Sequence, residues 1–284
     1  MHARMPKNFV LEERMERYAD AIETGAAAYR GRWAEACWPL DRADGEGRPG
    51  RFEAVHLDLG CGKGSYIAEM ARRPPRTLYL GMDSEPVCVV YAAQLICELG
   101  LPNALVIPGD AARLDSIFAP GELSAISINF PTPHPKRRGA RLRVTNAHHL
   151  AGYQPLLAPG AAVTLRTDSA PLYEYSLQQF AAAGWQELWR TRDDRADHPD
   201  TPLTEYEERL SAQGATVHAV RAVPAPMPTT PEQLAAADEL PQSLFDYLPE
   251  DLFEGTYIPH GMSYAIENFR NHRMHERMRA IGTR

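Results

Sequence analysis

Short apolar runs alternate with amphipathic stretches through the middle of the chain, between residues 54 and 167. The runs are too short for ordinary helices and are typical of strands buried on both faces of a sheet. The stretches between them have the three-to-four spacing of helices. This alternation predicts an α/β fold built on a doubly wound parallel sheet. We expect strands at 54–59, 78–82, 104–107, 125–129 and 161–167, and helices at 65–72, 85–99, 111–118 and 145–157.

The pattern changes on both sides of this region. Residues 11–37 have helical spacing and precede a polar, glycine-bearing loop at 41–51. After the parallel strands, the pattern predicts two further strands, of which one could run antiparallel, at the end of the sheet. We expect helices at 171–183 and 204–212 and strands at 186–191 and 215–223.

Four prolines between residues 224 and 231 indicate a stiff linker, and a helical pattern at 262–281 follows it. We therefore expect a helical lead-in at 1–51, a main domain at 52–223, and a proline-rich linker with a helical extension at 224–284.

Composition narrows the classes of protein that fit. The 284 residues are 44% apolar and 24% charged, which is typical of a globular chain. The net charge of −7 argues against a generic polyanion binder, so any contact with nucleic acid requires a local basic patch. The chain has no apolar run of about 20 residues and begins with a charged segment, so we expect a cytoplasmic protein without membrane contact. The 4 cysteines form no C-x-x-C pair and the histidines have no acid cluster beside them, so we expect no metal.

The strongest local motif is a glycine-rich turn that follows the first predicted strand. Asp58 ends the strand, and Gly60, Gly62 and Gly64 lie in the turn into the next helix. Glycines at such a turn leave bare backbone for a ligand, and the helix N-terminus adds free N–H donors. The spacing differs from the dinucleotide fingerprint G-x-G-x-x-G, and a carboxylate at this point would repel a pyrophosphate. The motif therefore favours a cationic ligand such as the sulfonium and amino groups of S-adenosylmethionine, or else a turn that binds nothing.

Two further acids follow the next two predicted strands. Asp83 follows the second strand, where an acid can accept both ribose hydroxyls of a nucleoside, and Asp110 follows the third. Ligands of open α/β sheets bind at these strand ends. Either acid alone could be a solvated loop residue or a helix cap, but three acids at successive strand ends favour a binding site.

A basic segment follows the fourth predicted strand. No Asp or Glu occurs between Glu122 and Asp168, and the prolines of the segment favour an extended loop that presents its cations. We expect these side chains to contact RNA phosphates, although a solvated basic loop is the alternative. The basic side chains are those of Lys136, Arg137, Arg138, Arg141 and Arg143.

With these motifs in order, the chain resembles the tRNA guanine-N7 methyltransferases of bacteria. The family has a glycine-rich turn after an acid, an F-P-D-P-W-P-K-K-R loop after the fourth strand, a T-D pair after the fifth, and a T-x-[FY]-E-x-R element. The resemblance covers about residues 52–223. This chain has D-L-G-C-G at 58–62, F-P-T-P-H-P-K-R-R at 130–138, T-D at 167–168 and T-E-Y-E-E-R at 204–209.

The resemblance implies the class I S-adenosylmethionine-dependent methyltransferase fold, which has a Rossmann-like seven-stranded sheet. It implies formation of N7-methylguanine at a variable-loop guanine of tRNA, by a monomer or a homodimer. Lys136 would contact the RNA or the guanine, and Asp168 would accept hydrogen bonds from the guanine edge. Thr204 and Glu207 would complete the substrate pocket, and Thr132 stands at the position of the catalytic acid. From spacing alone, Asp168 could instead cap a helix, and the T-x-x-E pair at 204–207 could be a capping box.

The chain departs from the family at the F-P-D-P-W loop. Thr132 replaces the acid and His134 replaces the tryptophan, and the first two acids are Asp where the family usually has Glu. These departures leave two alternatives open. One is a divergent paralogue that methylates another nucleobase or a small molecule, and the other is an RNA-binding pseudoenzyme that retains the cofactor fold.

Overall fold

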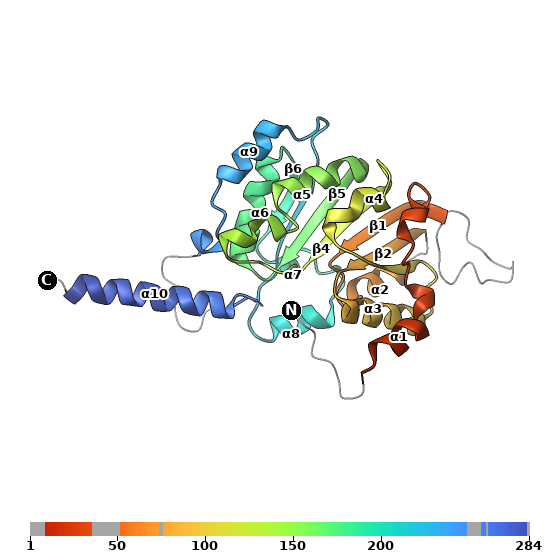
Figure 1. The fold of residues 1–284 in the computed structure, drawn as a ribbon, viewed down its shortest axis with the longest axis horizontal. Helices are drawn as coiled ribbons and strands as arrows, with labels where there is room; N and C mark the ends of the chain where they lie inside the picture. The colour runs from red at the N-terminus through yellow and green to blue at the C-terminus, as the bar shows by residue number, and fades with distance from the viewer. Residues whose placement is uncertain (1–8, 36–51, 74–75, 249–256, 260, 283–284) are drawn as a thin grey trace. The chain divides into compact units, whose positions relative to one another are not determined.

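The computed structural model describes residues 9–35, 52–73, 76–248, 257–259 and 261–282 (Figure 1). The predicted loop at 41–51 and the end of the predicted first helix lie outside these residues. The chain divides into two compact units. Unit 1 comprises Met1–Asn129, Ala151–Leu165 and Asp200–Glu207, and unit 2 comprises Phe130–Leu150, Arg166–Pro199 and Glu208–Arg284.

The strands form a seven-stranded sheet in the order β3-β2-β1-β4-β5-β7-β6. β1 is parallel to β2 and β4, β2 is parallel to β3, and β6 is antiparallel to β7. The parallel sheet and the antiparallel strand predicted at its end are both confirmed. The strand bounds are Ala54–Leu59 (β1), Thr77–Asp83 (β2), Ala104–Pro108 (β3), Leu123–Asn129 (β4), Leu157–Thr167 (β5), Gln186–Thr191 (β6) and His218–Val223 (β7).

The α-helices match most of the expected segments. The predicted helix at 11–37 is a short α-helix followed by 3-10 turns, and the predicted helix at 111–118 is a 3-10 turn followed by one α-turn. The α-helix bounds are Leu11–Arg17 (α1), Ser65–Ala71 (α2), Pro86–Leu99 (α3), Leu114–Ile117 (α4), Ala147–Tyr153 (α5), Ala170–Ala182 (α6), Asp194–Asp197 (α7), Glu205–Ser211 (α8), Pro231–Glu239 (α9) and Ser263–Gly282 (α10). The 3-10 helices are Ala19–Ala21, Ala26–Tyr29, Trp33–Glu35, Ala111–Arg113, Arg137–Leu142, Gln154–Leu156 and Leu244–Tyr247.

Unit 1 has its core where α2 and α3 pack on the first strands. α3 begins with Pro86 in its first turn, where a missing N–H costs nothing, and it ends at Gly100 in the left-handed conformation. Ile67 of α2, Ile96 of α3 and Val106 of β3 are buried in one cluster. This packing fixes where α2 starts, and therefore where the glycine-rich turn lies relative to the strand ends.

Unit 2 contains a helix that the sequence pattern did not predict. α9 begins with a capping box between Thr230 and Gln233, a local signal that was available in the sequence. Leu244, Met262 and Ile266 then pack with Leu172 and Tyr175 of α6 in one buried cluster. Residues after the proline-rich linker therefore share a core with the main domain.

None of the helices that the structure describes is both long and apolar enough to cross a membrane.

Candidate active site

The backbone of the glycine-rich turn, residues 60–64, is built to face a ligand. Gly60 and Gly62 have φ of 79° and 55°, which side chains rarely tolerate, and a Cβ added at either would meet nothing within 4 Å. The N–H groups of Gly60 and Cys61 donate to the carbonyl of Met82 at 2.8 and 3.0 Å, which ties the turn to the end of β2. The turn therefore exposes bare peptide to open space at the carboxyl edge of unit 1.

Gly64 has a different role in the same turn. Its φ is 79°, and a Cβ there would lie 2.7 Å from the Cβ of Ala92 in α3. We infer that this glycine permits the close approach of α2 to α3. Its contact with a cofactor stays a prediction.

Strand register places the three predicted acids at the ends of adjacent strands. In β1 and β2, Asp58 pairs with Gly81, and in β2 and β3, Asp83 pairs with Pro108, two residues before Asp110. Asp83 accepts hydrogen bonds from the N–H of Gly62 and of Glu85, both at 2.9 Å, so this acid also holds the glycine turn. Burial raises the pKa of Asp83. Asp110 caps the 3-10 helix that follows it by accepting from the N–H of Ala112 at 2.9 Å.

Asp58 is the most unusual group of the site. It is 1% exposed, and Asn129 at the end of β4 donates from Nδ2 to its Oδ1 at 2.9 Å. Within the described part of the chain, Oδ2 of Asp58 is buried without a hydrogen-bond partner. Burial, and secondarily the charge of Asp83, raise the pKa of Asp58 to about 7, although the Asn129 hydrogen bond lowers it.

These residues fit S-adenosylmethionine. The unpartnered oxygen of Asp58 is an acceptor that a cationic ligand would satisfy, and the open turn at Gly60 and Gly62 leaves space for a ligand. Asn129, which holds the carboxylate, is a site residue that the sequence analysis missed. Its signal was its place directly before Phe130, at the end of the fourth strand.

The basic loop, residues 130–143, is anchored in unit 2. Its first N–H, that of Phe130, donates to the carbonyl of Arg166 in β5 at 2.8 Å. Phe130 and His134 have φ of 51° and 45°, a conformation that costs energy for residues with a Cβ and that often marks functional loops. Burial and the charge of Arg143 lower the pKa of His134, so its ring is neutral at pH 7.

Arg143 corrects an expectation from the sequence. Its side chain is 1% exposed and lies inside the basic loop, with its guanidinium 4.4 Å from the ring centre of Tyr175. It donates to the carbonyls of Pro133 at 3.0 Å, His134 at 2.7 Å and Gln242 at 2.8 Å. Because these donors are used inside the protein, Arg143 does not present a cation to RNA and instead holds the loop in shape.

The other cations of the loop lie at the surface. Lys136, Arg137 and Arg138 are exposed. Arg141 is exposed and pairs with Asp238 at 2.8 Å. Thr132, at the position of the family's acid, is exposed as well. Their accessibility is compatible with RNA contact, and their role stays a prediction.

Asp168 follows β5 and is not the cap of the next helix. The cap of α6 is Ser169, whose hydroxyl accepts from the N–H of Leu172. Asp168 is 8% exposed and instead accepts a hydrogen bond at Oδ2 from the hydroxyl of Tyr257, at 2.7 Å. The helix-cap alternative is therefore wrong, and Tyr257 is a neighbour that no motif indicated.

Thr204 and Glu207 lie in unit 1 at the start of α8. Both are buried, and the hydroxyl of Thr204 accepts from the N–H of Glu207 at 3.2 Å. This is the first half of the capping box that the spacing allowed. A substrate contact by either residue stays a prediction.

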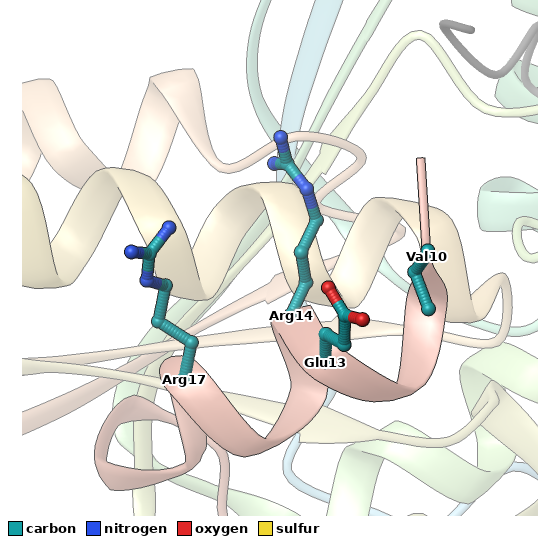
Figure 2. A pocket seen from close by; sticks show the side chains of 4 residues that line it. All are labelled: Val10, Glu13, Arg14 and Arg17. Carbon is teal, nitrogen blue, oxygen red and sulfur yellow. The ribbon is translucent and has the colours of Figure 1, made fainter. Parts of the chain in front are cut away.

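A hollow of about 420 Å³ lies on α1 and is lined by Val10, Glu13, Arg14 and Arg17 (Figure 2). Its lining side chains are mostly charged, and it contains none of the residues predicted for the site. Arg14 is occupied with Gln94, to which it donates at 2.6 Å. Small-molecule sites are usually more apolar and more enclosed, so we do not assign this hollow to the chemistry.

The described residues contain no group of three or more His, Cys, Asp or Glu side chains placed to hold a metal ion.

Comparison with known proteins first defines the class. The profile of the family described as "Putative methyltransferase" matches residues 53–220. Among solved structures, the 16S rRNA methyltransferase KamB aligns with a TM-score of 0.50 and 21% identity, over 62% of this chain and 89% of that one. With the strand order, these matches show a class I methyltransferase fold.

Curated relatives then define the family. The tRNA (guanine-N(7)-)-methyltransferase of Lactococcus lactis subsp. cremoris strain MG1363 is 31% identical over 213 residues, which cover 74% of this chain and 93% of the relative. The protein of the same description from Desulfitobacterium hafniense strain Y51 is 37% identical over 169 residues, covering 59% of this chain and 78% of the relative. The chain belongs to the tRNA (guanine-N7-)-methyltransferase family, as its motifs predicted.

Proposed function

We propose that this protein transfers a methyl group from S-adenosylmethionine to N7 of a guanine in tRNA, with the variable loop as the target region. The observation that carries the proposal is the buried Asp58 with an unpartnered oxygen, at the strand end that leads into the open glycine turn, in a chain of this family. S-adenosylmethionine, when bound, supplies an electrophilic methyl group on a positively charged sulfonium.

On the donor side, the chain binds by charge and by shape. Asp58 offers an acceptor to a cationic group, and Gly60 and Gly62 let a ligand approach the backbone. Asp83 accepts backbone hydrogen bonds from Gly62, Ser84 and Glu85, and because a carboxylate has about four lone-pair sites it can also accept from a ribose hydroxyl. Asn129 keeps the Asp58 carboxylate in one orientation.

On the acceptor side, the chain's residues orient the guanine. Guanine N7 has a free lone pair and carries no proton, so its methylation requires no general base. Asp168 accepts from the N1–H and amino group of the guanine and so fixes the base. Correct orientation lowers the barrier by about 7–11 kcal/mol relative to free reactants. A guanine held in line with the methyl group therefore needs little further catalysis. The uncharged hydroxyl of Thr132 is compatible with this chemistry.

The exposed cations of the basic loop hold the RNA backbone. Lys136, Arg137, Arg138 and Arg141 contact phosphates, which positions the tRNA without reading its sequence. We place this activity in the cytoplasm. Cys61, Cys88 and Cys97, the cysteines within the described residues, form no disulfide, which is compatible with a reducing compartment.

The test is label transfer from tritiated S-adenosylmethionine to unmodified tRNA, followed by digestion to nucleosides. We expect the label in N7-methylguanosine. Label in another nucleoside or in a small molecule would replace this function with that of a divergent paralogue. Binding of the donor without any transfer would make the chain a pseudoenzyme.

Two variants sharpen this test. Asp168→Asn presents an amide donor to the guanine N1–H, so we expect kcat/KM for tRNA to fall about 100-fold with donor affinity unchanged. Thr132→Asp restores the acid of the family, and we expect turnover to rise a few-fold. Unchanged or lower turnover in Thr132→Asp would show that the loop is adapted to a different acceptor.

A further inference from the structure

The C-terminal extension lies beyond the residues that the family profile matches, which end at 220. The described part of this extension is nevertheless tied closely to the basic loop. The N–H of Leu244 donates to the carbonyl of Pro135 at 2.9 Å, and the carbonyl of Gln242 accepts from Arg143 at 2.8 Å. Asp238 pairs with Arg141. The extension is therefore part of the support of the acceptor side in unit 2.

Residues 261–266 of the extension contact both the basic loop and the start of α6. Met262 is fully buried and accepts at its sulfur from the hydroxyl of Ser169, at 3.2 Å. A Cβ added at Gly261 would lie 3.5 Å from Cδ of Pro133, so the backbone passes beside the basic loop. Ile266 and Met262 pack against α6 in one buried cluster. These contacts hold the backbone a few residues after Tyr257 in place.

Tyr257, which precedes these residues in the chain, contacts Asp168. The phenol donates to Oδ2 at 2.7 Å, the short distance expected of a hydrogen bond to a carboxylate. A carboxylate has about four lone-pair sites, so it can accept from more than one donor at a time. The bond restricts rotation of the carboxylate about its side-chain axis. A guanine edge that presents two parallel donors requires such a fixed plane.

We propose that Tyr257 is a positioning residue for the acceptor base: its hydroxyl holds the Asp168 carboxylate in the orientation that receives the guanine N1–H and amino group. The inference rests on the proposed role of Asp168. The extension thus contributes a residue to the acceptor site, in addition to supporting the loop.

The test compares two tyrosines of the extension in the full-length protein. Tyr257→Phe removes the hydroxyl that contacts Asp168. Tyr247→Phe is the matched control, because its hydroxyl lies 2.8 Å from Oε1 of Gln178 and 3.0 Å from the carbonyl oxygen of Pro241, either of which accepts its one proton. We expect Tyr257→Phe to raise KM for tRNA about tenfold, as for loss of a hydrogen bond to a charged group, with donor affinity unchanged. Tyr247→Phe leaves KM within twofold.

A double-mutant cycle distinguishes action through Asp168 from a general loss of structure. In the Asp168→Asn background, Tyr257→Phe has no further effect on KM if the tyrosine acts through the carboxylate. Equal effects of Tyr257→Phe in both backgrounds would overturn the inference, and so would an unchanged or lower KM of Tyr257→Phe alone. Thermal unfolding of each variant checks that the protein is folded at the assay temperature.

The failure of this inference is distinct from the failure of the proposed function. If the wild type methylates guanine N7 and Tyr257→Phe behaves as the wild type does, only the role of Tyr257 is lost. If the wild type transfers no label to tRNA, the proposed function fails first. Filter binding of unmodified tRNA then still compares the affinities of the two tyrosine variants, and equal affinities would overturn the role of Tyr257 as well.

Discussion

The glycine-rich turn and the basic loop follow neighbouring strands of the fold, β1 and β4, but they are built in different ways. The turn depends on positive φ at Gly60 and Gly62, and the buried acid Asp58 lies two residues before Gly60. The basic loop includes two non-glycine residues with positive φ, and long-range contacts from Arg143 and the C-terminal extension hold it.

This difference separates what the family shares from what is particular to this chain. The turn keeps the family's glycine spacing, with Asp58 where the family usually has Glu, and hydrogen bonds to Met82 and Asp83 tie it to the end of β2. The basic loop has lost the acid and the tryptophan at Thr132 and His134, and it relies on residues after 224 that lie beyond the matched profile. The donor side thus depends on the glycine turn and the ends of β1 and β2, and the acceptor side on contacts between the basic loop and the C-terminal extension.

The largest effect on stability and activity should come from removing the buried arginine that supports the basic loop. Arg143→Ala leaves several buried carbonyls without donors, so we expect the free energy of unfolding to fall by about 3 kcal/mol and methyl transfer to be lost. Arg138→Ala removes an exposed cation from the same loop and should change stability by less than about 0.5 kcal/mol. Denaturant titration of both variants measures this. Equal stability of the two would contradict the assignment of Arg143 as the loop's support.

The glycine turn offers a similar contrast within five residues. Gly64→Ala places a Cβ against Ala92 at a positive φ, so we expect a loss of about 2–4 kcal/mol of stability. Gly62→Ala meets no protein atom, so it should cost only about 1 kcal/mol and mainly weaken donor binding. Calorimetry of donor binding and thermal unfolding separate the two. If Gly62→Ala binds the donor as the wild type does, the open space at the turn is not the ligand site.

Asp58 predicts two pH dependences of opposite sign. Its pKa of about 7 is above its ordinary value of 3.8, so protonation favours the folded protein, and this contribution to stability is lost as pH rises from about 4 through 7. Donor binding requires the carboxylate, so the dissociation constant of the donor should be about tenfold larger at pH 6 than at pH 7.5. Calorimetry across this range measures the binding, and Asp58→Asn should flatten both dependences. If the dissociation constant of the wild type does not change with pH, Asp58 does not take part in donor binding.

The smallest effect concerns the exposed cations. The slope of log affinity for tRNA against log salt changes by about 0.7–0.9 for each phosphate contact. The double variant of Arg137→Ala and Arg138→Ala should therefore reduce the slope by about 1.4–1.8. Arg76→Ala removes an exposed cation of unit 1 that pairs with Glu53 and serves as the control. Equal slopes for both proteins would exclude the two loop arginines as phosphate ligands.

The sequence was sufficient for the features that depend on local pattern. Apolar runs predicted strands β1 to β5, because strands buried on both faces need continuous apolar residues, and the three acids were expected at one edge because the ends of parallel strands meet there. The role of Arg143 could not be predicted, since a charge run looks the same whether its last arginine is exposed or buried against the carbonyls of residues 133, 134, 136 and 242. The contact of Tyr257 with Asp168 joins residues 89 positions apart, and no spacing rule links them.

Transfer of the methyl group to N7 of a tRNA guanine is tested most directly with tRNA transcripts made with 7-deazaguanine. In these transcripts a carbon replaces N7, so the lone pair that attacks the methyl group is absent while the Watson–Crick edge and the phosphates are unchanged. The account predicts that the transcript binds with the affinity of ordinary tRNA and receives no label from tritiated S-adenosylmethionine. Label incorporated into the 7-deazaguanine transcript at the rate seen for ordinary tRNA would contradict it.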